Sequence, residues 1–417
     1  MRHNHHVLSV LICAAMAVAL CGCTHKDDTP PPPPAQPVSV ALTVADQAPH
    51  QIKIGVLVPP MEGEGSEFRA MADGAGIAAY RFAMSGVSVT LMIGLDDGTP
   101  SGADAAMRSL TDAGVAGVVM AATGAHTSQA LASATAAGTP VIMVYDQPST
   151  TTPGVWSIAP TRTAVTSTLT SALSQVRASK PVLVTDQDPP LAFTAVHQIL
   201  PDDPASVAVT VITDVQNRIA DSVIVDTHAA QQALIVAAIQ HGLGDLQIPV
   251  LVTPEALTPV FSQTLAQADA STTWLLAAGT DTDDMAGLTH GAQADAASAF
   301  FTALRLAAND PGCRNIYTDD TCASAAPWAD IASHDAVVAV VRAVEHAGTA
   351  TPSAVRDTLA HLDLSPVDGL AGPGLDFTHP AALPDSAVVV LHSTTTNPGV
   401  RPTPTDQARL FWFAATP

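Results

Sequence analysis

Two cysteines late in the chain have a spacing that could carry covalent chemistry. Cys313 and Cys322 lie in a loop-like stretch that is rich in Asp, Asn, Pro and Gly. Such a pair can form a disulfide or contribute to a metal site, but no third and fourth ligand with suitable spacing accompanies it. In an oxidising compartment we expect the disulfide, and closing so short a loop contributes ~2–3 kcal/mol in the chain-entropy model.

Motifs of enzymes are scarce. Gly63-Glu-Gly65 is placed like the start of a dinucleotide-binding loop, but Phe68 holds the third glycine position and two acids would face a pyrophosphate. The sequence has no Gly-x-Ser-x-Gly, no phosphate loop and no His-Glu-x-x-His, and its histidines lack metal spacing. We therefore expect no enzyme, no cofactor and no metal.

The N-terminal residues have the pattern of an export signal. An apolar run from Leu8 to Gly22 follows a short basic start, and it is too short for a membrane span. Leu20-Cys-Gly-Cys23 resembles the bacterial lipobox, in which the last cysteine is acylated. We expect a signal peptide over residues 1–22, a lipid on Cys23 and a proline-rich tether over 23–50. A plain cleaved signal with an incidental cysteine is the alternative.

Composition limits the partners. The chain has 417 residues, a net charge of −22 and 47% hydrophobic residues, of which few are aromatic. The length beyond the tether predicts two lobes rather than one domain. The negative charge argues against nucleic acid or anionic lipid as a partner surface, and it indicates a solvated surface or an acidic face.

The elements that must position any site alternate between apolar strands and Ala-rich helices. The first strand is expected at 52–58, and strands at 87–93, 115–121 and 140–145 follow with helices between them. In the second half we expect strands at 181–185, 222–225 and 249–252, and also a helix near 191–200 and a strand at 207–212. Uninterrupted apolar strands are typical of parallel sheets covered on both faces, and ligands bind beyond the carboxyl ends of such strands.

Several segments, in their order, resemble one family. They are Ile52-Lys-Ile-Gly-Val-Leu-Val-Pro, Asp96-Asp-Gly-Thr-Pro, Ala136-Ala-Gly-Thr-Pro-Val-Ile, Ser333-His-Asp-Ala-Val and Leu370-Ala-Gly-Pro-Gly-Leu-Asp-Phe. The chain resembles the type 1 periplasmic binding proteins, in particular the branched-chain amino acid group that serves ABC importers. The resemblance implies two doubly wound α/β lobes with a ligand cleft between them. It predicts lobe 1 over 51–159 and 281–352, and lobe 2 over 160–280 and 353–417.

The resemblance also implies where a ligand would bind. The family's carboxylate-binding hydroxyls correspond to the Thr123–Thr127 loop, and Gln147 falls near a second family threonine. Asp146 is a departure, because its charge would repel a ligand carboxylate. The family's ammonium-binding acid matches Glu255 in Pro254-Glu255, whereas the loop with Asp186 lacks the family's aromatic residue. The expected ligand-binding residues are Thr123, Thr127, Asp146, Gln147, Asp186 and Glu255.

Four of these residues also have a purely structural interpretation. Glu255 could begin a helix, Thr123 and Thr127 could cap one, and Asp186 could stabilise a turn. The leading hypothesis is a lipid-anchored, extracytoplasmic protein that captures a small amine-bearing or amino-acid-like ligand for the subunits of an ABC permease, with membrane contact through the lipid alone. The alternative is a ligand sensor or an envelope scaffold on the same fold, with an envelope protein as its partner.

Overall fold

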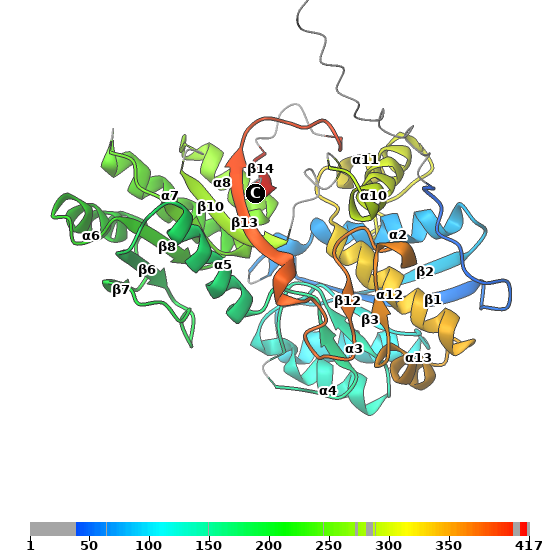
Figure 1. Cartoon of the computed structure of the whole chain (residues 1–417). Helices are drawn as coiled ribbons and strands as arrows, with labels where there is room; N and C mark the ends of the chain where they lie inside the picture. Colours follow the sequence, from blue (N-terminus) through cyan, green and yellow to red (C-terminus); the bar gives the residue numbers. More distant parts are fainter. Residues whose placement is uncertain are drawn as a thin grey trace, which may run out of the picture. The chain divides into compact units, whose positions relative to one another are not determined.

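The computed structural model describes residues 39–414 apart from 64, 149, 245, 272–273, 281–286, 288 and 403–408. The predicted signal, Cys23 and the proline run therefore lie outside the described residues. The described residues contain two α/β lobes, each built on its own sheet (Figure 1).

The first sheet is parallel throughout and has the strand order β2-β1-β3-β4-β5. Its strands are β1 (Gln51–Val58), β2 (Ser88–Leu95), β3 (Val118–Met120), β4 (Val141–Met143) and β5 (Val155–Ser157). Helices cover both faces, because alternate residues of each strand point to opposite sides. Val56 and Ile142 pack in one apolar cluster with α2 and α12, whereas Leu57 and Met120 pack in another with α3 and α4.

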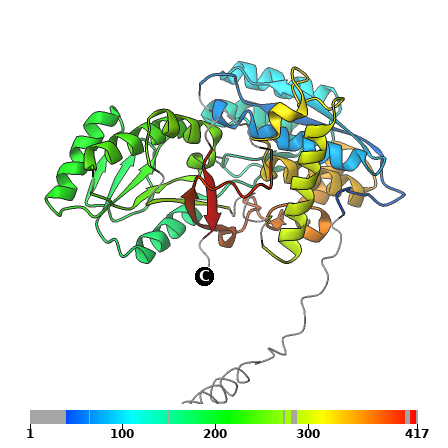
Figure 2. The ribbon, with the colours of Figure 1, turned by 90° about the horizontal axis from the view of Figure 1, so that it is seen from above.

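The helices of this lobe come from distant parts of the sequence. They are α2 (Gly74–Ala83), α3 (Pro100–Asp112), α4 (Ser128–Ala136), α10 (Ala292–Asn309), the short α11 (Cys322–Ala325), α12 (Ile331–Ala347) and α13 (Pro352–Leu359). Figures 1 and 2 show the late helices, in yellow to orange, beside the blue strands β1 and β2. The buried α12 carries much of this packing and contacts α2, β1 and α13.

The second sheet has the order β14-β13-β10-β9-β8-β6-β7. Its strands are β6 (Pro181–Thr185), β7 (His197–Ile199), β8 (Ser222–Asp226), β9 (Val250–Val252), β10 (Leu275–Thr280), β13 (Val388–Thr394) and β14 (Phe411–Ala414). The strands from β10 to β7 pair in parallel, and β13 and β14 are antiparallel. The predicted class of two doubly wound lobes is thereby confirmed, with an antiparallel edge on the second sheet.

The second sheet is also covered on both faces. Its helices are α5 (Arg162–Gln175), α6 (Pro204–Gln216), α7 (Ala229–Leu243) and α8 (Pro259–Gln267). Val223 and Val225 pack with α6, α7 and α8, while Ile224 between them packs in the cluster that contains Leu169 of α5. This alternation explains why β8 is apolar at its three central positions.

Two predicted elements of the second lobe are wrong. The expected strand at 207–212 belongs to α6, which Asp203 caps by accepting a hydrogen bond from the Ser206 N–H at 3.0 Å. The expected helix near 191–200 is irregular chain that ends in the edge strand β7. Pro204 occupies the first turn of α6, where a missing N–H costs nothing, so the helix begins there despite its β-branched residues.

Residues 39–48 of the predicted tether lie on the first lobe. Leu42 is buried in the core, and its N–H donates to the Arg81 carbonyl at 3.1 Å. Arg342 of α12 donates to the Thr43 carbonyl at 2.8 Å. The described part of this segment is thus held by α2 and α12.

The predicted disulfide between Cys313 and Cys322 is confirmed. It links the chain after α10 to the start of α11, and Cys322 is buried against the first lobe. The predicted lobe boundaries stay a prediction. The packing of α13 on α12, and of Phe377 against Trp156, keeps residues 352–377 beside the first lobe.

Candidate functional site

Loops after the carboxyl ends of strands from both sheets surround one cavity of about 310 Å³. Parallel strands end together at one edge of a sheet, so polar residues that follow different strands converge there. The first lobe contributes the segments after β1, β3 and β4, and the second contributes those after β6, β8 and β9. The polar and charged lining residues are Glu67, Thr123, Thr127, Ser128, Tyr145, Asp146, Gln147, Gln187, Asp226, Thr227, His228 and Glu255.

The structure brings five of the six predicted residues together. Thr123, Thr127, Asp146, Gln147 and Glu255 all line this cavity. Asp186 does not line it; this exposed residue accepts a hydrogen bond from the side chain of Gln187, which does. Their role in binding a ligand stays a prediction.

The loop after β3 presents one hydroxyl that has no hydrogen-bond partner in the part of the chain that the structure describes. Thr127 is used internally, because its hydroxyl donates to the Gly124 carbonyl at 2.8 Å. Thr123 is only 8% exposed, and among the described residues its side chain has no hydrogen-bond partner. The β1 loop passes close by: a Cβ on Gly65, which has a φ of +81°, would lie 2.4 Å from Thr123 Oγ1. Glycine is therefore required at position 65 to leave this hydroxyl its place.

Asp146 ties the loops after β3 and β4 together. The Gly124 N–H donates to its Oδ2 at 2.9 Å, and the Gln147 N–H donates to its Oδ1 at 2.7 Å. The Ser157 hydroxyl donates to its carbonyl at 2.7 Å. The Gln147 side chain in turn donates to the Ala159 carbonyl at 2.6 Å. Both oxygens of this carboxylate thus accept backbone donors of the cavity wall.

Glu255 stands at the start of a short 3-10 helix, η4 (Pro254–Leu257), directly after β9. The Thr253 hydroxyl donates to its Oε2 at 2.5 Å, and the Gln232 side-chain amide donates to that hydroxyl at 2.6 Å. Burial raises the pKa of Glu255 above its ordinary value, and the nearby charge of Asp226 acts in the same direction, against the Thr253 hydrogen bond. A cation in the cavity would favour the ionised form.

Asp226 completes the wall of the second lobe. This residue is 3% exposed, and its Oδ2 accepts hydrogen bonds from Arg162 at 2.9 Å and from the Thr185 hydroxyl at 3.0 Å. Arg162 lies on α5, outside the residues that line the cavity. It therefore offsets the charge of Asp226 without lining the cavity itself.

Sequence reasoning missed an aromatic wall and a buried acid. Phe68 stacks on Tyr145 with ring centroids 4.4 Å apart and planes 11° apart. Glu67 is 8% exposed, and its Oε1 lies 4.0 Å from His228 Nδ1, which is beyond hydrogen-bond distance. The signal that could have found both is their place in a 3-10 turn, η1 (Ser66–Phe68), just after β1, because that segment ends at the edge where ligands bind.

The aromatic wall is fixed by the start of α12. The Tyr145 hydroxyl donates to Asp330 Oδ2 at 3.0 Å and lies 2.7 Å from the Ser333 hydroxyl. Asp330 also caps α12 by accepting from the Ser333 N–H at 2.9 Å. Burial raises the pKa of Tyr145 above its ordinary value and that of Asp330 to about 7. The Tyr145 hydroxyl thus keeps its proton, and its contacts with Asp330 and Ser333 fix the position of the ring.

The comparisons with known proteins agree with this architecture. The model of the family described as periplasmic binding protein matches residues 51–392. The chain belongs to this family. Membership implies a location outside the cytoplasm, and proteins of the family bind small molecules. A search of curated proteins found no match.

Solved periplasmic binding proteins share the fold at low sequence identity. The branched-chain amino acid binding protein LivJ of Streptococcus pneumoniae, solved with isoleucine, superposes with a TM-score of 0.63 at 18% identity, covering 88% of this chain and 100% of LivJ. The leucine-binding protein LivK of Thermotoga maritima gives 0.60 at 15% identity, covering 87% and 98%. A type 1 periplasmic binding protein of Bordetella pertussis gives 0.61 at 16%, covering 87% and 99%. The predicted resemblance to type 1 proteins is confirmed.

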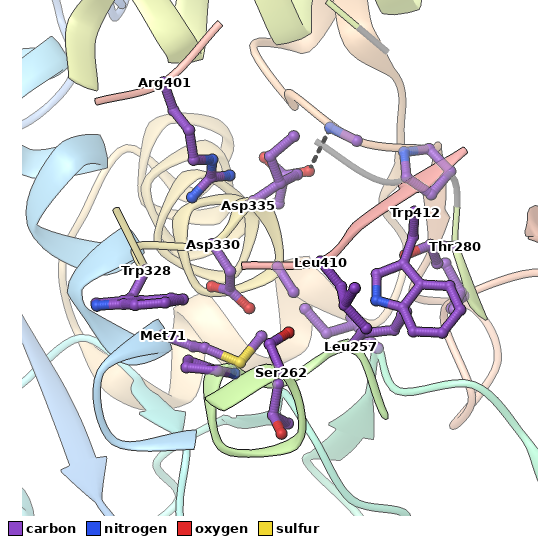
Figure 3. Close-up of a pocket in the computed structure, with 18 of the residues that line it drawn as sticks. Met71, Leu257, Ser262, Thr280, Trp328, Asp330, Asp335, Arg401, Leu410 and Trp412 are labelled. Atoms are coloured by element: carbon purple, nitrogen blue, oxygen red, sulfur yellow. Dashed lines mark hydrogen bonds between the residues drawn. The ribbon is translucent and has the colours of Figure 1, made fainter. Parts of the chain in front are cut away.

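This periplasmic binding protein has a second cavity of about 150 Å³ (Figure 3). Apolar residues such as Met71, Trp328 and Leu410 line it together with two acids. Asp335 accepts the N–H groups of Ala371 and Gly372, both at 2.8 Å, and Asp330 is engaged by Tyr145 and Ser333. Because protein donors already use these acids, we place the candidate ligand site in the larger of these two cavities, that of about 310 Å³.

The described residues add neither a metal site nor a membrane-spanning helix. They contain no group of three or more His, Cys, Asp or Glu side chains that could hold a metal ion. Over the same part of the chain, no helix has the length and apolar character needed to cross a membrane.

Proposed function

We propose that this protein is a lipid-anchored, extracytoplasmic solute-binding protein that captures a small amine-bearing ligand and delivers it to an ABC permease. One observation carries the proposal: four carboxylates, from Glu67, Asp146, Asp226 and Glu255, line the larger cavity. The described lining residues include no lysine or arginine. A cation enclosed there would gain charge-assisted hydrogen bonds, which are about twice as strong as neutral ones.

Glu255 is the proposed anchor of the ligand's ammonium group. It lies in the cavity directly after β9, and its partner Thr253 uses only one of its two carboxylate oxygens. The stacked rings of Phe68 and Tyr145 supply an apolar wall against which a carbon chain could rest. Small-molecule sites commonly combine such apolar walls with a few polar groups that fix orientation.

A thermal-shift screen of the purified full chain tests the proposal. The panel contains amines, amino acids, sugars and organic acids, and each hit is confirmed by calorimetry. A ligand present at 100 times its Kd contributes about 2.7 kcal/mol to stability, so a true ligand gives a clear shift. We expect the hits to carry an ammonium group; hits confined to sugars or organic acids, or none at all, would overturn the proposal.

The alternative is a ligand sensor or an envelope scaffold on the same fold. Asp146 favours it, because a carboxylate in this position changes the cavity away from that expected for amino-acid uptake. Uptake of the labelled ligand by cells with and without the gene separates the two functions. Import that requires the protein supports delivery to a permease, whereas unchanged import by cells that lack it supports the sensor or scaffold.

A further inference from the structure

We infer that the ligand is an organic cation without a carboxylate, an amine rather than an amino acid, because Asp146 already occupies the donors that a ligand carboxylate would need. This inference rests on the proposed function and narrows its ligand class. The evidence is the distribution of hydrogen-bond donors and charges around the larger cavity.

Two backbone donors of the first-lobe wall are already paired. The N–H groups of Gly124 and Gln147 donate to the two different oxygens of Asp146, at 2.9 and 2.7 Å. A carboxylate that accepts two such N–H groups occupies them as fully as a ligand carboxylate could. Asp146 thus stands where an acidic group of a ligand would have to bind, and it carries the same charge.

Two side-chain donors of the same loops are also committed. The Thr127 hydroxyl donates to the Gly124 carbonyl, and the Gln147 amide donates to the Ala159 carbonyl. An incoming carboxylate could accept from the Thr123 hydroxyl, but it would lose its hydration beside the like charge of Asp146. A buried charge that is only partly paired and stands next to a like charge is strongly unfavourable.

Two buried groups of this wall can instead accept a hydrogen bond from a ligand. The Thr123 side chain has no hydrogen-bond partner among the described residues, and Glu67 has only the distant His228. Both residues line the cavity and are 8% exposed. Because both side chains face the cavity, a ligand that donates hydrogen bonds can reach them. An ammonium group, which has three donors and no acceptor, matches both.

The charges favour the same class of ligand. Glu67 and Asp146 on the first-lobe wall, and Asp226 and Glu255 on the second-lobe wall, place carboxylates on both sides of the cavity. Arg162 offsets the charge of Asp226, and an amine gains from the field of the other carboxylates. An amino acid gains at its ammonium end but is repelled at its carboxylate end, so the net attraction is smaller.

Matched pairs of compounds test the inference. Isothermal calorimetry on the purified full chain compares putrescine with ornithine, and isopentylamine with leucine; within each pair the amino acid differs by its added carboxylate. We expect the amine to bind at least about tenfold more tightly than its amino acid in at least one pair. Amino acids that bind as tightly as their amines in both pairs overturn the inference but leave the proposed function standing. If no compound binds and the wider amine screen is also blank, the proposed function fails as well.

Asp146→Asn provides a second readout. Removing the charge leaves one side-chain oxygen to accept from the loops, and we expect the preference for the amine over the amino acid to shrink at least about threefold. The matched control is Asp112→Asn, which removes the same charge from an exposed residue at the end of α3. An unchanged preference in Asp146→Asn, with the wild-type melting curve retained, contradicts the role given to Asp146.

Discussion

Replacing Glu255 with Gln isolates the charge of the proposed ammonium anchor. Glutamine has nearly the same shape and keeps an oxygen that can accept from the Thr253 hydroxyl, which donates at 2.5 Å in the native protein. The relay from Gln232 through Thr253 therefore survives. What disappears is the negative charge that faces the cavity. A loss of affinity would then report on the ligand's cation rather than on a collapsed wall.

The size of the loss follows from the contact that is removed. A hydrogen bond to a charged group contributes about 1.5–3 kcal/mol, and about 1.4 kcal/mol corresponds to a factor of ten in Kd. We expect Glu255→Gln to raise the Kd by about tenfold to 100-fold. The upper end applies if the ammonium is left desolvated and without another partner, since an unpaired buried charge costs more than the pair contributes. Asp226 in the same wall limits that cost, because it can attract the same cation.

Calorimetry with the best amine from the screen measures both proteins under identical conditions. Glu62→Gln is the matched control, because it makes the same change of charge at an exposed residue outside the cavity lining. We expect the control to bind like the wild type. Equal affinities for the wild type and Glu255→Gln would refute the anchor, and they would shift the interpretation toward a sensor or scaffold.

The remaining predictions concern stability and the anchor. Burial raises the pKa of Asp73 from 3.8 to about 7, against a hydrogen bond from the Ile316 N–H. The folded state then holds a proton that the unfolded state has released, so this carboxyl's contribution to stability is lost as pH rises from about 4 to about 7. In urea denaturation, the free energy of unfolding of Asp73→Asn should therefore rise relative to that of the wild type by up to about 4 kcal/mol between about pH 4 and about pH 7. Parallel pH profiles of the two proteins would contradict this. Changing Cys322→Ser opens the disulfide to Cys313 and should cost ~2–3 kcal/mol in the same assay, which an unchanged urea midpoint would exclude. Cys23→Ala should release the protein from membranes or leave its signal uncut, and detergent-requiring membrane association that persists in fractionation would count against the lipid.

Much of the fold was predictable because buried parallel strands leave a strong pattern in the sequence. The expected strand at 181–185 coincides with β6, and those at 222–225 and 249–252 overlap β8 and β9. The centres of these segments are uninterrupted apolar runs because helices cover both faces of their sheet. The pattern does not depend on distant contacts, so a reading of the sequence alone captures it.

The errors fall where local composition and tertiary packing disagree. The run Val207–Ile212 is rich in β-branched residues, which favour strands. Its buried residues Val207, Val211 and Val215 are spaced by four, so they form one helical face against the second lobe. A short β-rich run can fit either period, and here the cap from Asp203 and the packing of α6 on α7 decide the outcome.

The sequence predicted which loops form the candidate site, but it did not predict the contacts within them. Residues that follow β3, β4 and β9 were named from the resemblance to the type 1 periplasmic binding proteins, and the structure places them at the edge where ligands bind. Glu67 and Phe68 were missed because a helix was expected between the first two strands. The structure instead forms two short 3-10 turns, and α2 begins only at Gly74. A turn rather than a helix brings Glu67 and Phe68 to the cavity wall.

Asp146 shows what decides the role of an acid in this protein. The chain has a net charge of −22, and composition alone cannot separate surface acids from acids that bind a ligand. The acids that line the two cavities differ in their partners: Asp226 has Arg162, Asp335 has two backbone N–H groups, and Asp146 has two more. Glu67 is 8% exposed and has no hydrogen bond within the described residues. Since a buried charge without a partner is costly, the acid that the protein leaves unpaired is the one for which a ligand contributes most. The pairing of each carboxylate, rather than the number of carboxylates, therefore indicates the chemical class of ligand that the cavity binds.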